Sequence, residues 1–221
     1  APAGGALTTV QTSARAVIDW TSFSVGQAGS VNFMQPGSAS AVLNRVTGST
    51  PSTIAGQISG DGQVFLVNPN GIAITPTGSV QVGGSFIAST LGISNADFNA
   101  GNLNFTGKGA SAGVSNAGTI SSAAAGFVSL VGGTVSNTGT ITVPLGKVGL
   151  GSAEQATIDP TGDGFLQVAV PTGAAATDGR ALIDVAGRIN AAGGSIDIKA
   201  ATAQQAVREA VNISGSLSAR S

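Results

Sequence analysis

The side chains that usually carry catalysis are scarce in this sequence. Its 221 residues include no histidine, no cysteine and no tyrosine, and only 9% are charged, with 9 basic against 10 acidic residues. Without histidine the chain lacks the usual general base, and without cysteine it has no thiol nucleophile, thiolate metal site or disulfide. Nine scattered basic residues cannot form the basic face that nucleic-acid binding needs. We therefore expect no nucleic-acid partner, and most enzyme classes are disfavoured.

The acidic residues do not gather into a reactive group. A polysaccharide-degrading β-helical enzyme would need a carboxylate cluster, and the ten carboxylates here are scattered along the chain. The segment from Asp159 to Gly164 resembles the start of a calcium loop, but Val170 stands at the twelfth position, where a carboxylate is needed. Gly146-Lys147 lacks the preceding glycine of a phosphate-binding loop. We predict a plain turn at Asp159, no catalytic residue, no metal and no cofactor.

The most specific local motif is Asn68-Pro69-Asn70-Gly71. Proline, asparagine and glycine at the second, third and fourth positions fit a type I turn, and the Asn68 side chain can brace it with an Asx hydrogen bond. Apolar segments on both sides, 64–67 and 72–74, are expected to be strands. Residue types alone therefore predict a tight corner between two strands.

A short repeat gives the chain its architecture. Glycine, any residue and then an aliphatic residue recur at Gly56, Gly78, Gly118, Gly139, Gly187 and Gly215. The first and third steps between these glycines are nearly equal, the second and fourth are about twice as long, and the last is intermediate. These steps indicate a solenoid with about 21 residues per coil. In chain order we interpret them as one turn, two turns, one turn, two turns with an insertion, and one turn with an insertion.

Composition identifies the solenoid as a parallel β-helix. The 21 valines and 15 isoleucines outnumber the 11 leucines, and branching at Cβ favours strands. Aliphatic side chains would fill a narrow lumen, and the glycines would supply positive φ at the corners. Asn116 and Asn137 fall at the same position of adjacent coils, so we predict that they stack and exchange an amide hydrogen bond.

Two regions break the period, and a third is helix-like. We predict extra-helical hairpins near 85–108 and 159–173, and the only helix-like stretch is Ala203–Val211. Apolar runs are far shorter than the ~20 residues of a membrane span, so no stable membrane insertion is expected. The chain is predicted to be a single domain over 1–221, with a cap region over 1–35 and coils over 36–221.

The motif at Asn68 is one of several ordered blocks between residues 14 and 170. These blocks are Arg15-Ala16-Val17-Ile18-Asp19-Trp20 with Phe23, Val31-Asn32-Phe33 with Gln35-Pro36, Ala41-Val42-Leu43-Asn44-Arg45-Val46-Thr47-Gly48, Gly62-Gln63-Val64-Phe65-Leu66-Val67-Asn68-Pro69-Asn70-Gly71-Ile72, Ala88-Ser89-Thr90-Leu91 and Asp97-Phe98. Through them the chain resembles the amino-terminal secretion domain of two-partner secretion exoproteins, the filamentous haemagglutinin family, over most of residues 14–170. Where members closest to filamentous haemagglutinin carry an upstream Asn-Pro-Asn-Leu motif, this chain has a different segment, 36–40.

The resemblance implies a fold, a partner and a location. The fold is a right-handed parallel β-helix with an amino-terminal cap and extra-helical strands, and Asn68, Pro69, Asn70 and Gly71 form the family's corner motif. The partner is a cognate outer-membrane transporter, a β-barrel with periplasmic recognition domains. The domain would pass through the periplasm to the cell surface or medium and seed folding of a long exoprotein, an adhesin-like protein of which this chain is expected to be a fragment. Binding of host surfaces or glycans would belong to the downstream exoprotein.

Two other functions compete with secretion. A stand-alone adhesin module would display exposed aromatic side chains along a groove for glycans, whereas an exposed sheet edge favours strand addition by a transporter. The less favoured alternative, a polysaccharide-degrading enzyme, needs the carboxylate cluster that the sequence does not show.

Overall fold

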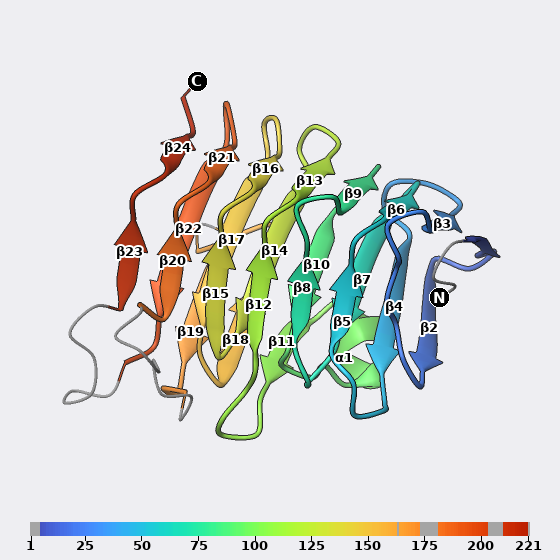
Figure 1. Cartoon of the computed structure of the whole chain (residues 1–221), viewed down its shortest axis with the longest axis horizontal. Coiled ribbons are helices and arrows are strands. Elements are labelled where there is room, and N and C mark those ends of the chain that lie inside the picture. The colour runs from blue at the N-terminus through green and yellow to red at the C-terminus, as the bar shows by residue number, and fades with distance from the viewer. Residues whose placement is uncertain (1–4, 163, 173–180, 203–209, 221) are drawn as a thin grey trace.

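Three parallel sheets, here named A, B and C, wind around one apolar lumen (Figure 1). The computed structural model describes residues 5–162, 164–172, 181–202 and 210–220. Sheet A consists, in spatial order, of β1 (Ala6–Val10), β3 (Ser30–Met34), β6 (Gln57–Gly60), β9 (Ser79–Val82), β13 (Thr119–Ser122), β16 (Thr140–Thr142), β21 (Arg188–Asn190) and β24 (Ser216–Ser218). Sheet B consists of β2 (Arg15–Trp20), β4 (Ala41–Val46), β7 (Gln63–Val67), β10 (Phe86–Ser89), β14 (Phe127–Gly132), β17 (Lys147–Ser152) and β22 (Ser195–Ala200). Sheet C consists of β5 (Ser52–Ile54), β8 (Ile72–Ile74), β12 (Gly113–Asn116), β15 (Thr134–Asn137), β20 (Ile183–Val185) and β23 (Val211–Ile213).

Each coil after the first contributes strands to sheets A, B and C in that order, and the first coil reaches sheet C only through a single bridge between Val25 and Ile54. Successive coils pair in parallel and in register, so that Val80 of β9 aligns with Ile120 of β13, and Ile120 with Ile141 of β16. The seven strands of sheet B mark seven coils in the described part of the chain, and β24 begins the next. The predicted parallel β-helix is confirmed.

The coil count corrects the interpretation of the glycine steps. The two long steps, from Gly78 to Gly118 and from Gly139 to Gly187, suggest two turns each, yet β9 pairs directly with β13 and β16 pairs directly with β21. Each of these steps is therefore one coil that carries a long insertion. Spacing alone misled because an insertion of about one coil length and an extra coil add the same number of residues between two corner glycines.

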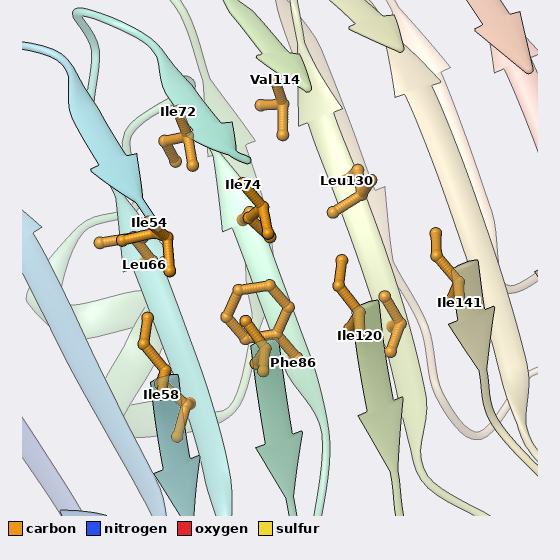
Figure 2. Packing of buried hydrophobic residues seen from close by; sticks show 14 of the residues in the cluster. Ile54, Ile58, Leu66, Ile72, Ile74, Phe86, Val114, Ile120, Leu130 and Ile141 are labelled. Atoms are coloured by element: carbon orange, nitrogen blue, oxygen red, sulfur yellow. The ribbon is translucent and has the colours of Figure 1, made fainter. Parts of the chain in front are cut away.

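The lumen is filled by aliphatic side chains stacked in columns. Figure 2 shows Ile54 and Ile74 from sheet C facing Leu66 and Phe86 from sheet B. The main core cluster contains inward residues of all three sheets, all of them almost fully buried. Each added coil is therefore stabilised mainly by the apolar surface that it buries against the preceding coil.

The repeated glycines are explained by close approach of the backbone and not by positive φ. A Cβ on Gly118 would overlap the carbonyl oxygen of Gly78, and one on Gly139 would overlap that of Gly118. Neither Gly118 nor Gly139 has a positive φ, so the expected conformational reason is wrong for this column. Glycine is needed here because adjacent coils stack backbone against backbone.

An extra-helical layer covers the outer face of sheet B. It contains α1 (Asn95–Ala100) and a three-stranded antiparallel sheet of β11 (Leu103–Thr106), β18 (Gln155–Ile158) and β19 (Leu166–Ala169). A second core, with Phe65, Phe98 and Phe165 among its members, lies between this layer and sheet B. Sheet B is therefore buried on both faces, which explains its near-continuous apolar strands.

The insertion boundaries differ from the predicted ones. Phe86–Ser89 belongs to sheet B, so the first insertion begins after Ser89 and not at residue 85. Strand β18 begins at Gln155 and already belongs to the extra-helical sheet, so the second insertion begins before residue 159. Among the described residues of the two insertions, β18 and β19 form a hairpin, and β11 joins them as a third strand instead of forming a hairpin of its own. The pairing of β11 with β18 joins segments that lie far apart in the chain, which no local pattern reports.

The short helix α1 was not predicted, although the sequence carries a signal for it. The Ser94 hydroxyl accepts from the Asp97 backbone amide, and Gly101 ends the helix at φ +79°. Ser-x-x-Asp followed by glycine is an N-cap and C-cap pair. The predicted helical stretch Ala203–Val211 lies almost wholly outside the described residues, and its last residue begins β23.

The residues predicted as a cap continue the coil pattern in the described range 5–35. β1 and β2 pair with β3 and β4 in sheets A and B. The Trp20 and Phe23 rings pack edge to face at 5.3 Å, and the Trp20 indole donates to Asn44 Oδ1 at 3.0 Å. Half-buried Trp20 thus covers part of the lumen at this end of the solenoid.

Candidate functional site

The Asn-Pro-Asn-Gly corner joins β7 of sheet B to β8 of sheet C. The Gly71 amide donates to Asn68 O at 3.2 Å, which closes the turn, and the Asn70 amide donates to Asn68 Oδ1 at 3.0 Å, which is the expected Asx bond. Both hydrogen bonds that residue types suggested are present.

Asn68 ties this corner to the preceding coil. Its side chain is fully buried, and Nδ2 donates to Thr50 O at 3.0 Å and to Ser52 Oγ at 2.9 Å. Asn70 Nδ2 likewise donates a hydrogen bond to Gly48 O of the preceding coil at 2.8 Å. Buried amides with complete hydrogen bonding specify one geometry, so the corner fixes the stacking of coil on coil.

Gly71 and Pro69 have different roles in the same turn. Gly71 has φ +118°, a conformation that side-chain-bearing residues rarely adopt. The Pro69 side chain is exposed. Beside the corner, the outer face of sheet C has a shallow hollow of about 310 Å³, bordered by Pro51, Gly71 and Gly113. Pro69, the half-buried Asn70 and this neighbouring hollow are therefore accessible from solvent.

The predicted asparagine ladder is two rungs long. Asn116 Nδ2 donates to Asn137 Oδ1 at 2.8 Å, and both side chains are buried in the lumen. Ile74 and Val185 occupy the same column on either side. Backbone groups at the next corner complete the bonding: the Gly118 amide donates to Asn116 Oδ1 at 3.2 Å, and Asn137 Nδ2 donates to Gly139 O at 3.4 Å. These contacts within an aliphatic column indicate a structural role.

A double substitution tests the ladder. Asn137→Val is expected to cost about 1–3 kcal/mol of unfolding free energy, because Asn116 Nδ2 loses its buried acceptor. Asn116→Val together with Asn137→Val should cost less than the sum of the single changes, since aliphatic neighbours already fit this column. Urea unfolding of the three variants gives the coupling energy. Additive costs would show that the two amides do not act as a pair.

The few cations hold the extra-helical layer onto sheet B. Arg15 donates to Phe98 O at 2.7 Å, and its guanidinium lies 5.2 Å from the Phe98 ring centre. Arg45 donates to Ile93 O at 3.0 Å and to Asn95 Oδ1. These two side chains anchor α1 from the first two coils. No local sequence pattern assigns them this role.

Charged side chains also protect the outer edge of β19. Asp197 Oδ2 accepts from the Leu166 amide at 3.2 Å, and Lys199 Nζ donates to Leu166 O at 2.6 Å. Lys147 Nζ donates to Pro160 O at 2.9 Å and to Gly162 O at 3.1 Å. Asp197 and Lys199 thus take the place of a neighbouring strand at Leu166, which is one way to block unwanted edge pairing, and Lys147 binds the turn between β18 and β19.

Glu154 is a buried carboxylate that links the two insertions. It is 4% exposed, and it accepts from the Gly109 amide at 2.9 Å, the Ser111 amide at 2.9 Å and the Ser111 hydroxyl at 2.7 Å. The Thr172 hydroxyl adds a fourth bond at 2.8 Å. Burial raises the pKa of Glu154, but the bonds from Ser111, Gly109 and Thr172 outweigh it and hold the pKa below its ordinary value of 4.5.

This lowered pKa predicts acid sensitivity. Because the folded-state pKa lies below the unfolded-state pKa, the contribution of Glu154 is complete above about pH 4.5 and is lost as the pH falls through the folded value. Glu154→Gln should therefore lower stability at pH 7 and flatten the decline of stability in acid. Urea unfolding of both proteins between pH 3 and pH 7 measures this. A constant difference between them across that range would contradict the role of this carboxylate.

The remaining candidates show no reactive arrangement in the described ranges. No three acidic residues gather there. Asp159 Oδ1 accepts from the Thr161 amide, the Thr161 hydroxyl and the Gly162 amide, which is the expected plain turn, while Asp163 lies outside the described residues. All eight phenylalanines are buried, so none presents an exposed ring to a glycan. In the same ranges no helix is long and apolar enough to span a bilayer.

Comparison with protein families gives a match over nearly the whole chain. A family model described as the TPS secretion domain matches residues 2–221. The fold also resembles the crystal structure of the HMW1 secretion domain from Haemophilus influenzae, with 34% sequence identity and a TM-score of 0.72 over 87% of this chain and 51% of that one.

Two curated relatives are similar over shorter segments. Both are heme/hemopexin-binding proteins of Haemophilus influenzae, one 38% identical over 100 residues and the other, from strain Rd, 42% identical over 83 residues. These matches cover 45% and 38% of this chain but only 11% and 9% of the relatives. The chain therefore corresponds to a small part of much longer proteins.

Proposed function

Because this chain belongs to the TPS secretion domain family, we propose that it directs the export of a large exoprotein through a dedicated outer-membrane transporter and seeds the folding of that exoprotein at the cell surface. The family match over residues 2–221 carries the proposal. The relatives' lengths support a large exoprotein, since the matched segments are about a tenth of them.

The far end of the solenoid supports the seeding step. β22, β23 and β24 are the last strands of their sheets, and Val211, Ile213 and Leu217 are 37%, 47% and 38% exposed. A further coil would gain both hydrogen bonds and apolar burial on this surface, and it would find a formed template in place of a costly nucleus. Folding outside the outer membrane would then bias movement outward.

Recognition by the transporter is proposed to precede stacking. A chain that threads through a narrow barrel must be unfolded, and few charges, no cysteines and small side chains suit that passage. The periplasmic domains of the transporter would bind backbone edges by strand addition.

Co-expression tests the proposal. The chain, preceded by a secretory leader and followed by a reporter, is produced with and without a transporter that matches its parent exoprotein. We expect release of the reporter only when the transporter is present, and strong loss of release when its periplasmic domains are deleted. Equal release without the transporter would refute the export function. The adhesin alternative gains no support, because all eight phenylalanine side chains are buried and Trp20 is half-buried.

A further inference from the structure

In the described part of the chain, no β-ladder joins the extra-helical layer to the solenoid. β11, β18 and β19 form a sheet that shares no ladder with sheets A, B or C. The strands of sheet B keep all their neighbours in the coil stack whether or not the layer is present. Opening of the layer therefore breaks no coil-to-coil ladder, although it uncovers the second core.

The chain order makes this layer close late. β11 follows the fourth strand of sheet B, but its partner β18 comes only after two further sheet B strands, β14 and β17. Apart from a single bridge between Gly92 and Thr106, β11 has no strand partner among the preceding residues. When coils are added in chain order, Phe98 of α1 already covers Phe65 of β7, with their ring centres 5.2 Å apart. The outer face of sheet B at Phe127 of β14 stays uncovered until the hairpin supplies Phe165, whose ring centre lies 5.5 Å away.

We infer that the β18–β19 hairpin closes onto sheet B only after the coils beneath it have formed, and that the hydrogen bonds of Glu154 hold it closed. We call this hairpin the clasp and Glu154 its latch. The closed clasp locks together coils that otherwise contact only their neighbours. The latch is specific because Glu154 binds the loop after β11 through two backbone amides and one hydroxyl. The lock is long-range because the layer contacts Arg15 in the first coil and Lys199 in the seventh.

The loop held by Glu154 provides a direct readout. Lys108 is exposed, and the amide of the next residue, Gly109, donates to Glu154 Oε2. Trypsin cleaves after lysine and needs a locally opened segment, so cleavage after Lys108 reports opening of the clasp. Cleavage after Arg188, which lies in coil strand β21, reports opening of the solenoid.

The first experiment compares Glu154→Gln with the wild-type chain at pH 8 by mass spectrometry of tryptic fragments. We expect cleavage after Lys108 to be faster by about tenfold or more, because charge-assisted hydrogen bonds are replaced by weaker ones. Cleavage after Arg188 should be unchanged. The matched control is Asp159→Asn, which changes a half-buried carboxylate in the turn of the same hairpin; asparagine can keep the oxygen that braces this turn, so the substitution should alter neither rate.

An engineered disulfide between β11 and β18 tests whether cleavage after Lys108 requires the clasp to open. Asn104 and Thr157 are aligned neighbours on β11 and β18, and their side chains meet at 3.1 Å between Oδ1 and Oγ1. Directly opposed positions of an antiparallel pair have a separation that suits a disulfide, and the native chain has no other cysteine. Added to Glu154→Gln, the pair Asn104→Cys and Thr157→Cys should restore protection of Lys108 when oxidised and lose it when reduced.

Three results would overturn the inference. Unchanged cleavage after Lys108 in Glu154→Gln would show that this carboxylate is no latch. Equal acceleration after Lys108 and Arg188 would show that the layer and the coils open together. Fast cleavage after Lys108 in the oxidised crosslinked variant would show that the loop opens without the clasp.

Discussion

Gly118→Ala is expected to destabilise the domain by about 3 kcal/mol or more, a large part of the stability of a typical domain. The added Cβ would overlap the backbone oxygen of Gly78 and press on that of Thr75 at 2.5 Å, and neither belongs to a side chain that can rotate away. The two coils would have to separate locally, which weakens the ladder between β9 and β13. Urea unfolding monitored by circular dichroism measures the change.

The matched control for this substitution is Gly37→Ala. An added Cβ at Gly37 has no atom within 4 Å, and this glycine has no positive φ. Alanine should therefore be neutral or stabilising by up to about 1 kcal/mol, since it restricts the unfolded chain. Equal losses in the two variants would show that the glycine column is not a stacking requirement.

Asn68→Ala is expected to remove about 3 kcal/mol or more of unfolding free energy and to reduce secretion in proportion. The substitution leaves Thr50 O and Ser52 Oγ without their donor and the Asn70 amide without its acceptor, all at one corner. Thermal and urea unfolding give the stability, and the co-expression assay gives the secreted fraction.

Three further corner variants separate folding from recognition. Gly71→Val forces a branched side chain into φ +118°, and Asn70→Pro removes the amide that donates to Asn68, so both should lower stability and secretion together. Pro69→Ala changes the exposed side chain and should leave both nearly unchanged. If any corner variant keeps its thermal stability and still loses export, the corner is a surface that the transporter reads directly.

The fold class was predictable because the repeated residues are the ones that stack on each other in adjacent coils. An aliphatic residue two positions after each corner glycine fills the lumen, as Ile120 and Ile141 do, and Asn116 and Asn137 meet at the expected offset. The Asn68 turn was predictable because its hydrogen bonds lie within four residues. Patterns that repeat or close locally can be read without knowing what lies beside them.

Contacts between distant segments were not predictable in the same way. The pairing of β11 with β18, the attachment of α1 by Arg15 and the burial of Glu154 among the amides of loop 107–112 join residues far apart in the chain. The short helix at Asn95 was missed even though Ser94 and Gly101 marked its ends, because strand periodicity dominated the interpretation of that region.

Residue order alone specifies that the chain winds into a β-helix, where its glycine corners fall and which asparagines stack. The number of coils, the reason for the glycines and the closure of the extra-helical layer emerge only from the folded molecule. The division is physical: a coil is specified by its own residues and by those of the adjacent coil, whereas the layer depends on side chains that become neighbours only after the coils have formed.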